Sequence, residues 1–346
     1  MADQLSEHAL LADYTTFRIG GPADTLIVAR TEEELVGAVR QADAESTPVL
    51  IVSGGSNILV ADEGFRGTAV VVATQGIEAE ESSEGVDLHV AAGESWDELV
   101  ARAVDQGWSG LEMLSGIPGL VGAAPVQNIG AYGAEITSVI TGVRAFDRLS
   151  SEVVDFEPED CRFGYRTSIF KQEQGRYVVL SVDLHLDIDP LSSPVEYDEL
   201  ARQLRVEIVS RVPLTDARRA VLELRRGKGM VLDESDHDTW SAGSFFTNPI
   251  VSADAATALP PDAPRFPQPN GTVKTSAAWL IDHAGFHKGY GTEPATLSTK
   301  HVLALTNRGG ATARDILALA RTIRDGVRAA YGIALEPEPT LVGLTL

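Results

Sequence analysis

The stretch that most constrains the fold reads GIPGLVGAAPVQNIGAYG and spans residues 116–133. Five of its residues are glycine, and few of its side chains are bulky. Such a backbone can approach a large flat ligand closely and offer N–H and C=O groups to its edge. A close-packed structural loop is the alternative, but a loop this long and apolar is hard to place without a partner. We therefore interpret residues 116–133 as a ligand-binding loop.

A second glycine-bearing segment, Ser53-Gly54-Gly55-Ser56-Asn57, directly follows the apolar run 49–52, which predicts a buried strand. Successive backbone N–H groups in such a turn can converge on a phosphate. The alternative is a tight turn in which glycine and asparagine adopt positive φ angles. The chain has neither G-x-G-x-x-G after a strand nor G-x-x-x-x-G-K-[ST]. Any nucleotide site must therefore use another architecture.

Composition and charge exclude several classes of protein. The 346 residues include 28 Lys and Arg against 50 Asp and Glu, a net charge of −22. This charge argues against a nucleic-acid binder and against docking on anionic lipid. The single cysteine, Cys161, excludes an intrachain disulfide and fits a reducing compartment. The first eleven residues lack the features of a signal peptide, and no apolar run approaches the ~20 residues that span a bilayer. We expect a soluble, cytoplasmic protein.

Apolar runs alternate with segments of helical periodicity, which favours an α/β or α+β protein. Capping-box spacings at Thr31, Ser95 and Thr312 predict three helix starts, and Gly107 and Gly285 predict two helix ends. Further helices are expected at 215–226 and 276–284. Strands are expected at 49–52, 69–73, 86–90, 139–146, 177–186, 241–248 and 341–346. Residues 187–195 read as a connector, and the proline-rich 260–269 as a loop.

Several residues with chemical potential are weak candidates when each is taken alone. His283 and His287 are four apart, but Gly285 lies between them and no acidic or cysteine set completes a ligand shell, so no metal site is expected. Cys161 reads as a small buried thiol. Ser244 stands beside two aromatics, Arg166 taken alone reads as a surface arginine, and Glu338 stands between two prolines. No periodicity links these three.

In combination, seven segments occur in the order typical of one family, and together they cover nearly the whole chain. They are TFRIGG (16–21), GGSN (54–57), the loop 116–133, YRTSIF (165–170), GSFFTNP (243–249), AWLID (278–282) and LEPE (335–338). In these segments the chain resembles the UDP-N-acetylenolpyruvoylglucosamine reductase (UDP-N-acetylmuramate dehydrogenase) family.

The resemblance implies an α+β fold and a division of the chain. Residues 1–190 would form an FAD-binding domain of the vanillyl-alcohol-oxidase/p-cresol-methylhydroxylase type, in two α+β subdomains. Residues 191–214 would be a linker with a tyrosine loop, and 215–332 an α+β substrate-binding domain. Residues 333–346 would carry the C-terminal strand back to the FAD-binding domain.

The resemblance also implies a bound FAD with NADPH as co-substrate, and the missing dinucleotide fingerprint then needs no other explanation. The FAD would lie on the two glycine-bearing segments. The residues implied are Ser53, Gly54, Gly55, Ser56, Asn57, Gly116, Ile117, Pro118, Gly119, Gly122, Ala123, Gln127, Asn128 and Gly130.

The implied reaction is the reduction of UDP-N-acetylglucosamine enolpyruvate to UDP-N-acetylmuramate in peptidoglycan synthesis. Hydride would reach C3 of the enolpyruvyl group and a proton would reach C2. The resemblance assigns the catalytic roles to Arg166, Ser244 and Glu338. Arg166 would hold the substrate carboxylate with its fork of donors, Glu338 would help to stabilise the developing enol, and Ser244 would donate the proton to C2.

Four more positions match or suggest contacts with the nucleotide sugar: Tyr197 as a covering tyrosine, and Lys228, Asn248 and Lys274 on the UDP portion. The chain departs from the family pattern at Thr247, where lysine is frequent, and in the acidic segment before Ser244. We expect a monomer that binds small molecules, with neither nucleic acid nor membrane as partner.

Two alternatives remain open from the sequence. One is another flavin oxidoreductase of the same fold that acts on a different alcohol or sugar, and the Ser244 and Glu338 contexts argue against it. The other is a non-catalytic module that binds a UDP-sugar or flavin, which the three matched catalytic positions make harder to sustain. A yellow protein that NADPH does not reduce would favour the second alternative.

Overall fold

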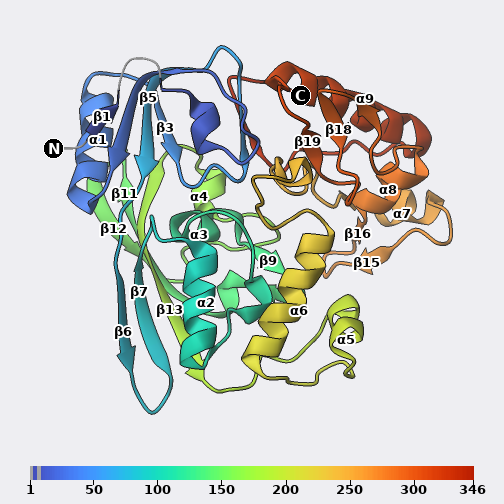
Figure 1. Ribbon diagram of the computed structural model, residues 1–346, viewed down its shortest axis with the longest axis horizontal. Coiled ribbons are helices and arrows are strands. Elements are labelled where there is room, and N and C mark those ends of the chain that lie inside the picture. Colours follow the sequence, from blue (N-terminus) through green and yellow to red (C-terminus); the bar gives the residue numbers. More distant parts are fainter. Residues whose placement is uncertain (1–2, 6–8) are drawn as a thin grey trace. The chain divides into compact units, whose positions relative to one another are not determined.

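The computed structural model describes residues 3–5 and 9–346, and these divide into two compact units (Figure 1). The first unit contains 23–54 and 66–231 together with the N-terminal segment. The second contains 10–22, 55–65 and 232–346. The expectation that the first eleven residues form no signal peptide falls partly outside the described residues. Each unit is described by itself.

The larger sheet of the first unit has six antiparallel strands and carries most of that unit's core. Its order is β12-β11-β13-β7-β6, with β8 paired to the end of β13 (Figure 1). The strands are β6 (Ile77–Glu81), β7 (Val86–Ala91), β8 (Trp108–Ser109), β11 (Ile140–Asp147), β12 (Glu152–Phe156) and β13 (Tyr177–Ile188). Helix α2 (Trp96–Gln106) buries Trp96, Leu99 and Ala103 in the same core.

The smaller sheet of the first unit has the order β1-β2-β5-β3. Its strands are β1 (Asp3–Leu5), β2 (Ala23–Ala29), β3 (Val49–Val52) and β5 (Phe65–Val72), and β3 runs parallel to β5. Helix α1 (Glu32–Ala44) contacts β2 and β3 and is capped by Thr31, whose side chain accepts a hydrogen bond from the Glu34 N–H. Leu35 and Val39 of α1 join the core of the larger sheet.

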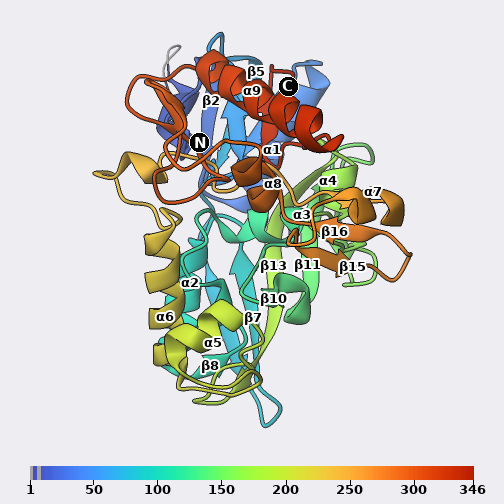
Figure 2. The ribbon, with the colours of Figure 1, turned by 90° about the vertical axis from the view of Figure 1, so that its right-hand side faces the viewer.

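Short elements complete the first unit. They are α3 (Ala124–Gln127), the hairpin β9 (Gly130–Ala131) and β10 (Ala134–Glu135), α4 (Ile169–Gln172), α5 (Asp198–Leu204) and α6 (Leu214–Gly227). Helix α5 lies against α6 over a small core that includes Val195, Leu200 and Val221 (Figure 2). The first unit also has the one-turn 3₁₀ helices η2 (Glu112–Leu114), η3 (Val121–Ala123) and η4 (Ile136–Ser138). Two others, η1 (Leu11–Tyr14) and η5 (His237–Thr239), belong to the second unit.

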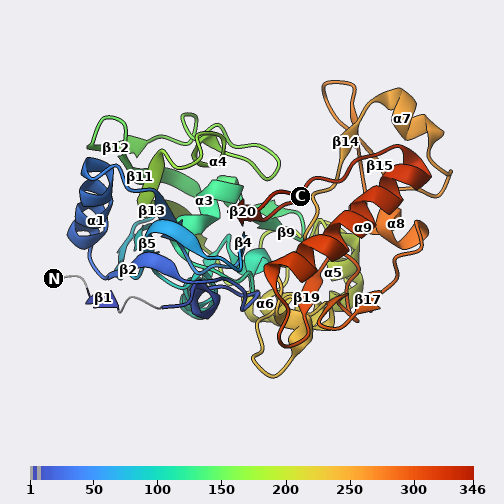
Figure 3. The same cartoon turned by 90° about the horizontal axis from the view of Figure 1, so that it is seen from above.

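The second unit is built around the long helix α9 (Ala313–Tyr331), which packs on α8 (Ala277–His283) and on a small sheet (Figure 3). This sheet has the order β17 (Gly291–Thr292), β18 (Ala295–Leu297), β19 (Leu305–Asn307). Another consists of β14 (Ile250–Val251), β16 (Val273–Thr275) and β15 (Arg265–Pro267), beside α7 (Ala253–Ala258). The C-terminal strand β20 (Thr340–Val342) runs parallel to β4 (Ile58–Val60).

The α+β class is confirmed, and so are most of the expected elements. Thr312 and Asp315 form a full capping box on α9, and Gly107 ends α2 in the left-handed conformation. Ser95 precedes the first residue of α2, as the predicted helix start requires, but its side chain makes no capping hydrogen bond. Two local predictions are wrong, because the loop 260–269 contains β15 and 241–248 forms no strand.

Residues 241–248 form no strand because the segment makes only an isolated bridge, Phe246 opposite Pro337, before Pro249 interrupts it. The terminal strand is also shorter than the expected 341–346, although its partner β4 does lie in the N-terminal 190 residues. The domain boundaries stay a prediction, but compactness places α6 in the first unit. Among residues 3–5 and 9–346, no helix is long and apolar enough to cross a bilayer.

Candidate active site

Arg166 lies in a tight turn of the first unit and reaches the glycine-rich loop. Gly164 and Thr167 exchange backbone hydrogen bonds around the turn, and Arg166 has a φ of 53°, which is uncommon for a residue other than glycine. Its Nη2 donates to the carbonyl of Gly130 at 2.7 Å and its Nη1 to that of Asn128 at 3.2 Å. The structure thus brings the predicted catalytic arginine to two predicted cofactor residues.

The start of the glycine-rich loop is held by Asp97 of α2. The Asp97 carboxylate accepts the Gly116 N–H at 2.6 Å and a two-pronged contact from Arg218 of α6. Burial raises the pKa of Asp97, but the hydrogen bonds from Arg218 and Gly116 outweigh it and hold the pKa below its usual range. The loop therefore begins at a fixed point between α2 and α6, which the sequence did not reveal.

The end of the loop is fixed by buried polar contacts. The buried Asn128 donates from Nδ2 to Glu135 at 2.9 Å and to the Gly164 carbonyl at 3.1 Å. Gln127 accepts a hydrogen bond from Lys171 at 2.8 Å. These amide side chains support the backbone on which Arg166 rests.

The two glycine-bearing segments predicted for FAD meet each other in the first unit. A Cβ on Gly54 would lie 2.9 Å from the Gly119 Cα, so the two backbones touch where only hydrogen side chains fit. Within the described residues, the Oγ of the adjacent Ser53 is buried and has no hydrogen-bond partner. A buried hydroxyl without a partner is costly unless a ligand supplies one. Ser53, Gly54 and Gly119 therefore fit a polar group of the predicted cofactor.

Other glycines of these segments have structural explanations. A Cβ on Gly122 would lie 2.5 Å from the Cβ of Ala92, one on Gly116 2.8 Å from Leu222, and one on Gly55 1.8 Å from the Tyr14 carbonyl oxygen. The sequence-based explanation of Gly122, a close approach to a ligand, is thus incomplete because close packing on Ala92 already requires glycine. Ile117 packs against the core of the first unit, and all of these cofactor assignments stay predictions.

A cluster of aromatic and charged side chains surrounds the predicted covering tyrosine. Tyr132 and Gly133, both with positive φ, form the two-residue turn of the β9–β10 hairpin. The Tyr132 ring meets the exposed Tyr197 ring edge-on with centroids 5.6 Å apart. The Lys228 ammonium lies 5.7 Å from the centroid of the Tyr132 ring. Tyr197 and Lys228, predicted separately, are therefore joined by Tyr132, which the sequence analysis missed.

Ser244 and Glu338 lie on adjacent segments of the second unit. The Glu338 N–H donates to the Phe245 carbonyl at 2.8 Å, and Phe246 is bridged to Pro337. Phe245 and Phe246 are fully buried with ring centroids 5.1 Å apart, so the backbone on either side of Ser244 has a firm anchor. Two residues about 94 positions apart in the sequence are thereby brought together.

Other predicted residues of the second unit also have structural contacts. Asn57 donates from Nδ2 to the Glu338 carbonyl at 3.4 Å, and its own carbonyl accepts the Thr340 N–H. The Asn248 Oδ1 accepts the Ala277 N–H at 2.9 Å, at the start of α8. Lys274 lies in β16 between Ile250 and Phe266 of the flanking strands. Asn57 thus supports the backbone of the predicted catalytic glutamate, whereas Asn248 supports a helix.

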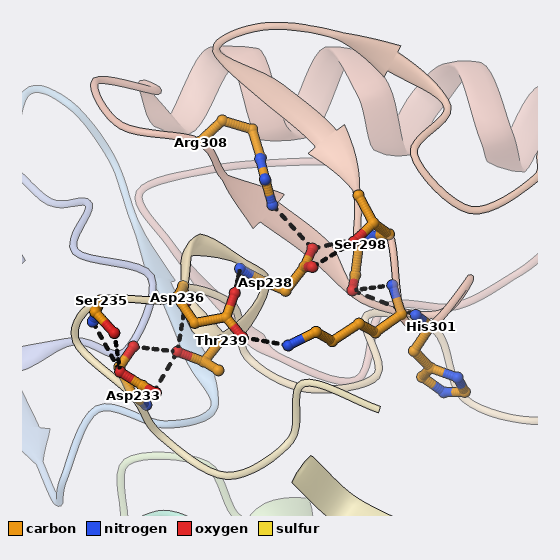
Figure 4. A network of polar contacts seen from close by, with 10 residues as sticks. Asp233, Ser235, Asp236, Asp238, Thr239, Ser298, His301 and Arg308 are labelled. Atoms are coloured by element: carbon orange, nitrogen blue, oxygen red, sulfur yellow. Dashed lines mark hydrogen bonds and ion pairs between the residues drawn. The ribbon is translucent and has the colours of Figure 1, made fainter. Parts of the chain in front are cut away.

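The acidic segment before Ser244 (Asp233, Glu234, Asp236 and Asp238) is tied mainly to residues 298–308 of the second unit (Figure 4). The buried Asp238 accepts hydrogen bonds from the Thr299 N–H at 2.9 Å and from Arg308 at 2.8 Å. Asp236 is paired with Lys300, and Asp233 accepts from the N–H and hydroxyl of Ser235. The carboxylates by which this segment departs from the family pattern are therefore paired with nearby cations and hydrogen-bond donors.

Cys161 is fully buried, and burial raises the pKa of its thiol to about 12, which confirms the interpretation of a small buried thiol. Among the described residues, no group of three or more His, Cys, Asp or Glu side chains is arranged to hold a metal ion. His287 instead contacts Asp282 at 2.9 Å, and His283 stacks on Trp279.

Comparison with known proteins identifies the family. Residues 23–157 match the FAD binding domain, and residues 234–342 match the C-terminal domain of UDP-N-acetylenolpyruvoylglucosamine reductase. The chain is 55% identical over 344 residues to the UDP-N-acetylenolpyruvoylglucosamine reductase of Cutibacterium acnes, covering 98% of this chain and 91% of that protein. The chain belongs to the UDP-N-acetylenolpyruvoylglucosamine reductase family.

Two further members of the family support this assignment. The Streptomyces coelicolor reductase is 54% identical over 349 residues, with 98% of this chain and 90% of the relative covered. The crystal structure of the Thermus caldophilus reductase superposes with a TM-score of 0.69 at 28% identity, over 99% of this chain and 100% of that one. The predicted α+β fold with an FAD-binding domain is thus confirmed, and the protein is an FAD-binding oxidoreductase of this family.

Proposed function

We propose that this protein reduces UDP-N-acetylglucosamine enolpyruvate to UDP-N-acetylmuramate, with NADPH as electron donor and a bound FAD. The observation that carries the proposal is the backbone pairing of the Ser244 segment with the Glu338 segment inside the second unit. Family membership suggests the reaction, and the pairing supports it because it joins the backbone segments that carry Ser244 and Glu338, two of the three proposed catalytic residues. The product would serve peptidoglycan synthesis, and with it cell shape and division, in the cytoplasm.

Bound FAD would supply the hydride chemistry, accepting hydride from NADPH and delivering it to C3 of the substrate. Ser53, Gly54 and Gly119 would hold the cofactor. Support comes from the unpartnered buried Ser53 hydroxyl and from the contact between the two glycine backbones.

Arg166 would bind and orient the substrate carboxylate. Addition of hydride at C3 moves charge toward the carboxylate, and a guanidinium offers a planar fork of donors to it. The carbonyls of Asn128 and Gly130 hold two arms of the Arg166 side chain, so its direction is set before substrate arrives.

Ser244 would protonate C2, and Glu338 would stabilise the developing enol. A serine hydroxyl is a weak acid, but an enolate-like carbon is basic enough to take its proton when the two are well placed. The buried Phe245 and Phe246 restrict the backbone on which Ser244 is carried. Tyr197 would cover the nucleotide sugar, while Lys228, Asn248 and Lys274 would contact its UDP portion.

The proposal is tested with the purified full-length protein, NADPH and the enolpyruvyl sugar. We expect yellow protein with about one FAD per chain, NADPH consumption that depends on the sugar, and a product heavier than the substrate by two hydrogen atoms. Gel filtration tests the expected monomer. NADPH consumption that is unaffected by the sugar would contradict the proposed substrate, and colourless protein that binds no added FAD would contradict the cofactor.

A further inference from the structure

Lys228, proposed to contact the UDP portion, already has an anionic partner. Its Nζ lies 2.5 Å from the Glu199 Oε2, and the two side chains are 30% and 33% exposed. Glu199 belongs to the first turn of α5, and Lys228 follows the last residue of α6. The ion pair therefore joins the two helices at the point where both are partly open to solvent.

The surroundings make Glu199 the carboxylate in contact with this ammonium. The Tyr132 ring also lies near Lys228, and Tyr132 in turn contacts Tyr197. Burial, followed in smaller measure by the nearby Glu199 charge, raises the pKa of Tyr132 to about 12, so its hydroxyl stays neutral. Arg225, also on α6, is buried close to Tyr132. Glu199 thus supplies a negative charge beside Lys228, close to the paired rings of Tyr132 and Tyr197.

We propose that Glu199 is the resident counter-ion of Lys228, and that the diphosphate of the nucleotide sugar must displace it to bind. This inference rests on the proposed function and deepens it by naming what sets the affinity. An ammonium is a compact point charge. Its contact with the Glu199 carboxylate occupies one of the positions that a diphosphate oxygen would otherwise take. A diphosphate on the same ammonium would lie beside the carboxylate, and like charges in a partly desolvated site repel each other.

The displacement also connects the diphosphate to the covering tyrosine. Glu199 is two residues from Tyr197, and both belong to the segment that begins α5. When the diphosphate takes Lys228, the ion pair between α5 and α6 opens. The end of α5 next to Tyr197 then loses one of its ties to α6. Glu199 is a positioning residue, because it acts on substrate only through Lys228.

The proposal is tested by titrating UDP into the FAD-loaded full-length protein. Glu199→Gln keeps the shape of the side chain and removes the competing charge. Because a partly exposed ion pair is worth up to about 1 kcal/mol, the Kd for UDP should fall about two- to fivefold. The KM for the nucleotide sugar should fall in parallel. The gain should shrink as salt rises from 0.05 to about 0.5 M, since ions screen partly exposed charges.

Glu223→Gln is the matched control. Glu223 accepts a hydrogen bond from Gln203 at 2.8 Å, so it also joins α5 to α6, but it is exposed and its partner is Gln203 rather than Lys228. It removes the same charge and should leave the Kd for UDP unchanged. A purely structural role of Glu199 predicts the opposite sign, because a loosened α5 binds UDP more weakly and raises KM.

Lys228→Gln separates this proposal from the function itself. In the Lys228→Gln background, Glu199→Gln should no longer tighten UDP binding, because the charge for which both anions compete is gone. A persisting gain in that background, or weaker UDP binding by Glu199→Gln alone, overturns the counter-ion role. Turnover of the enolpyruvyl sugar by the unsubstituted protein reports the proposed function independently of either result.

Discussion

Asp238→Asn tests how much the buried carboxylate of the acidic segment before Ser244 contributes to stability. The Asp238 side chain is 5% exposed and its partner Arg308 is 23% exposed. One oxygen accepts from the Thr299 N–H and from Arg308, and the other accepts from the Thr299 hydroxyl. Asparagine keeps the shape and one acceptor but leaves the Arg308 charge without its counter-ion.

The magnitude follows from these contacts. Breaking a buried pair by removing one partner costs about 3–5 kcal/mol, and each hydrogen bond to a charged group is worth about 1.5–3 kcal/mol. Since water reaches part of Arg308 and asparagine can still accept one hydrogen bond, we expect a loss of about 2–4 kcal/mol in the free energy of unfolding of the second unit.

Urea unfolding, followed by tryptophan fluorescence and by circular dichroism, measures this loss and separates the two units if they unfold apart. Asp254→Asn is the control, because it removes the same charge from an exposed position on α7 and should cost less than about 0.5 kcal/mol. An Asp238→Asn loss no larger than that of the control would refute the reasoning.

The pH dependence of the free energy of unfolding gives a second check that the ionised Asp238 carboxylate is stabilising. Burial raises the pKa of Asp238, but the hydrogen bonds from Thr299 outweigh it and lower the pKa below its usual range. A depressed carboxyl pKa stabilises the fold above the unfolded-state pKa of about 4, and that stability is lost as pH falls through the folded-state value. The stability difference between Asp238→Asn and the unsubstituted protein should therefore be constant from about pH 5 to 8 and shrink below about pH 4.

Three other predictions follow from the structure. Ser244→Ala should leave NADPH reduction of the flavin intact and slow turnover of the sugar by about 10²–10⁴, whereas near-normal turnover in stopped-flow traces would remove Ser244 as the proton donor. Gly122→Val should lower the urea stability of the FAD-free protein by about 1–3 kcal/mol, because its Cβ would collide with Ala92; an unchanged midpoint would contradict this. The hydrogen bond to Asp87 raises the pKa of His185, so its stabilising contribution is full below about pH 6.5 and is lost as pH rises through the folded-state value. His185→Asn should thus be destabilising at pH 5.5 and nearly neutral at pH 9, and a pH-independent difference in urea midpoints would disprove it.

Local signals in the sequence were enough for several elements of the fold. The Thr312 capping box, the C-terminal Gly107 and the apolar run 49–52 each specify structure through residues within a few positions. The same local reasoning failed at 241–248, for which a strand is expected and none forms. In that segment only Phe246 pairs as in a sheet, through an isolated bridge to Pro337, which is far away in the sequence.

Long-range contacts explain what the sequence could not reveal at the site. Gly122 is required by its close contact with Ala92, and Gly116 is favoured by its positive φ of 71°. Nothing near Gly122 in the sequence indicates that Ala92 is its neighbour. Tyr132 could have been found, because a tyrosine followed by glycine is compatible with a two-residue hairpin turn. Its contact with Tyr197 could not, since the two belong to different elements.

Anaerobic stopped-flow spectroscopy tests the central claim most directly, because it observes the two half-reactions of the proposed reductase separately. One equivalent of NADPH should abolish the oxidised-flavin absorbance, and subsequent UDP-N-acetylglucosamine enolpyruvate, without oxygen, should restore it while UDP-N-acetylmuramate appears in equal amount. A protein whose flavin NADPH does not reduce, or whose reduced flavin persists after the enolpyruvyl sugar is added, would contradict the account.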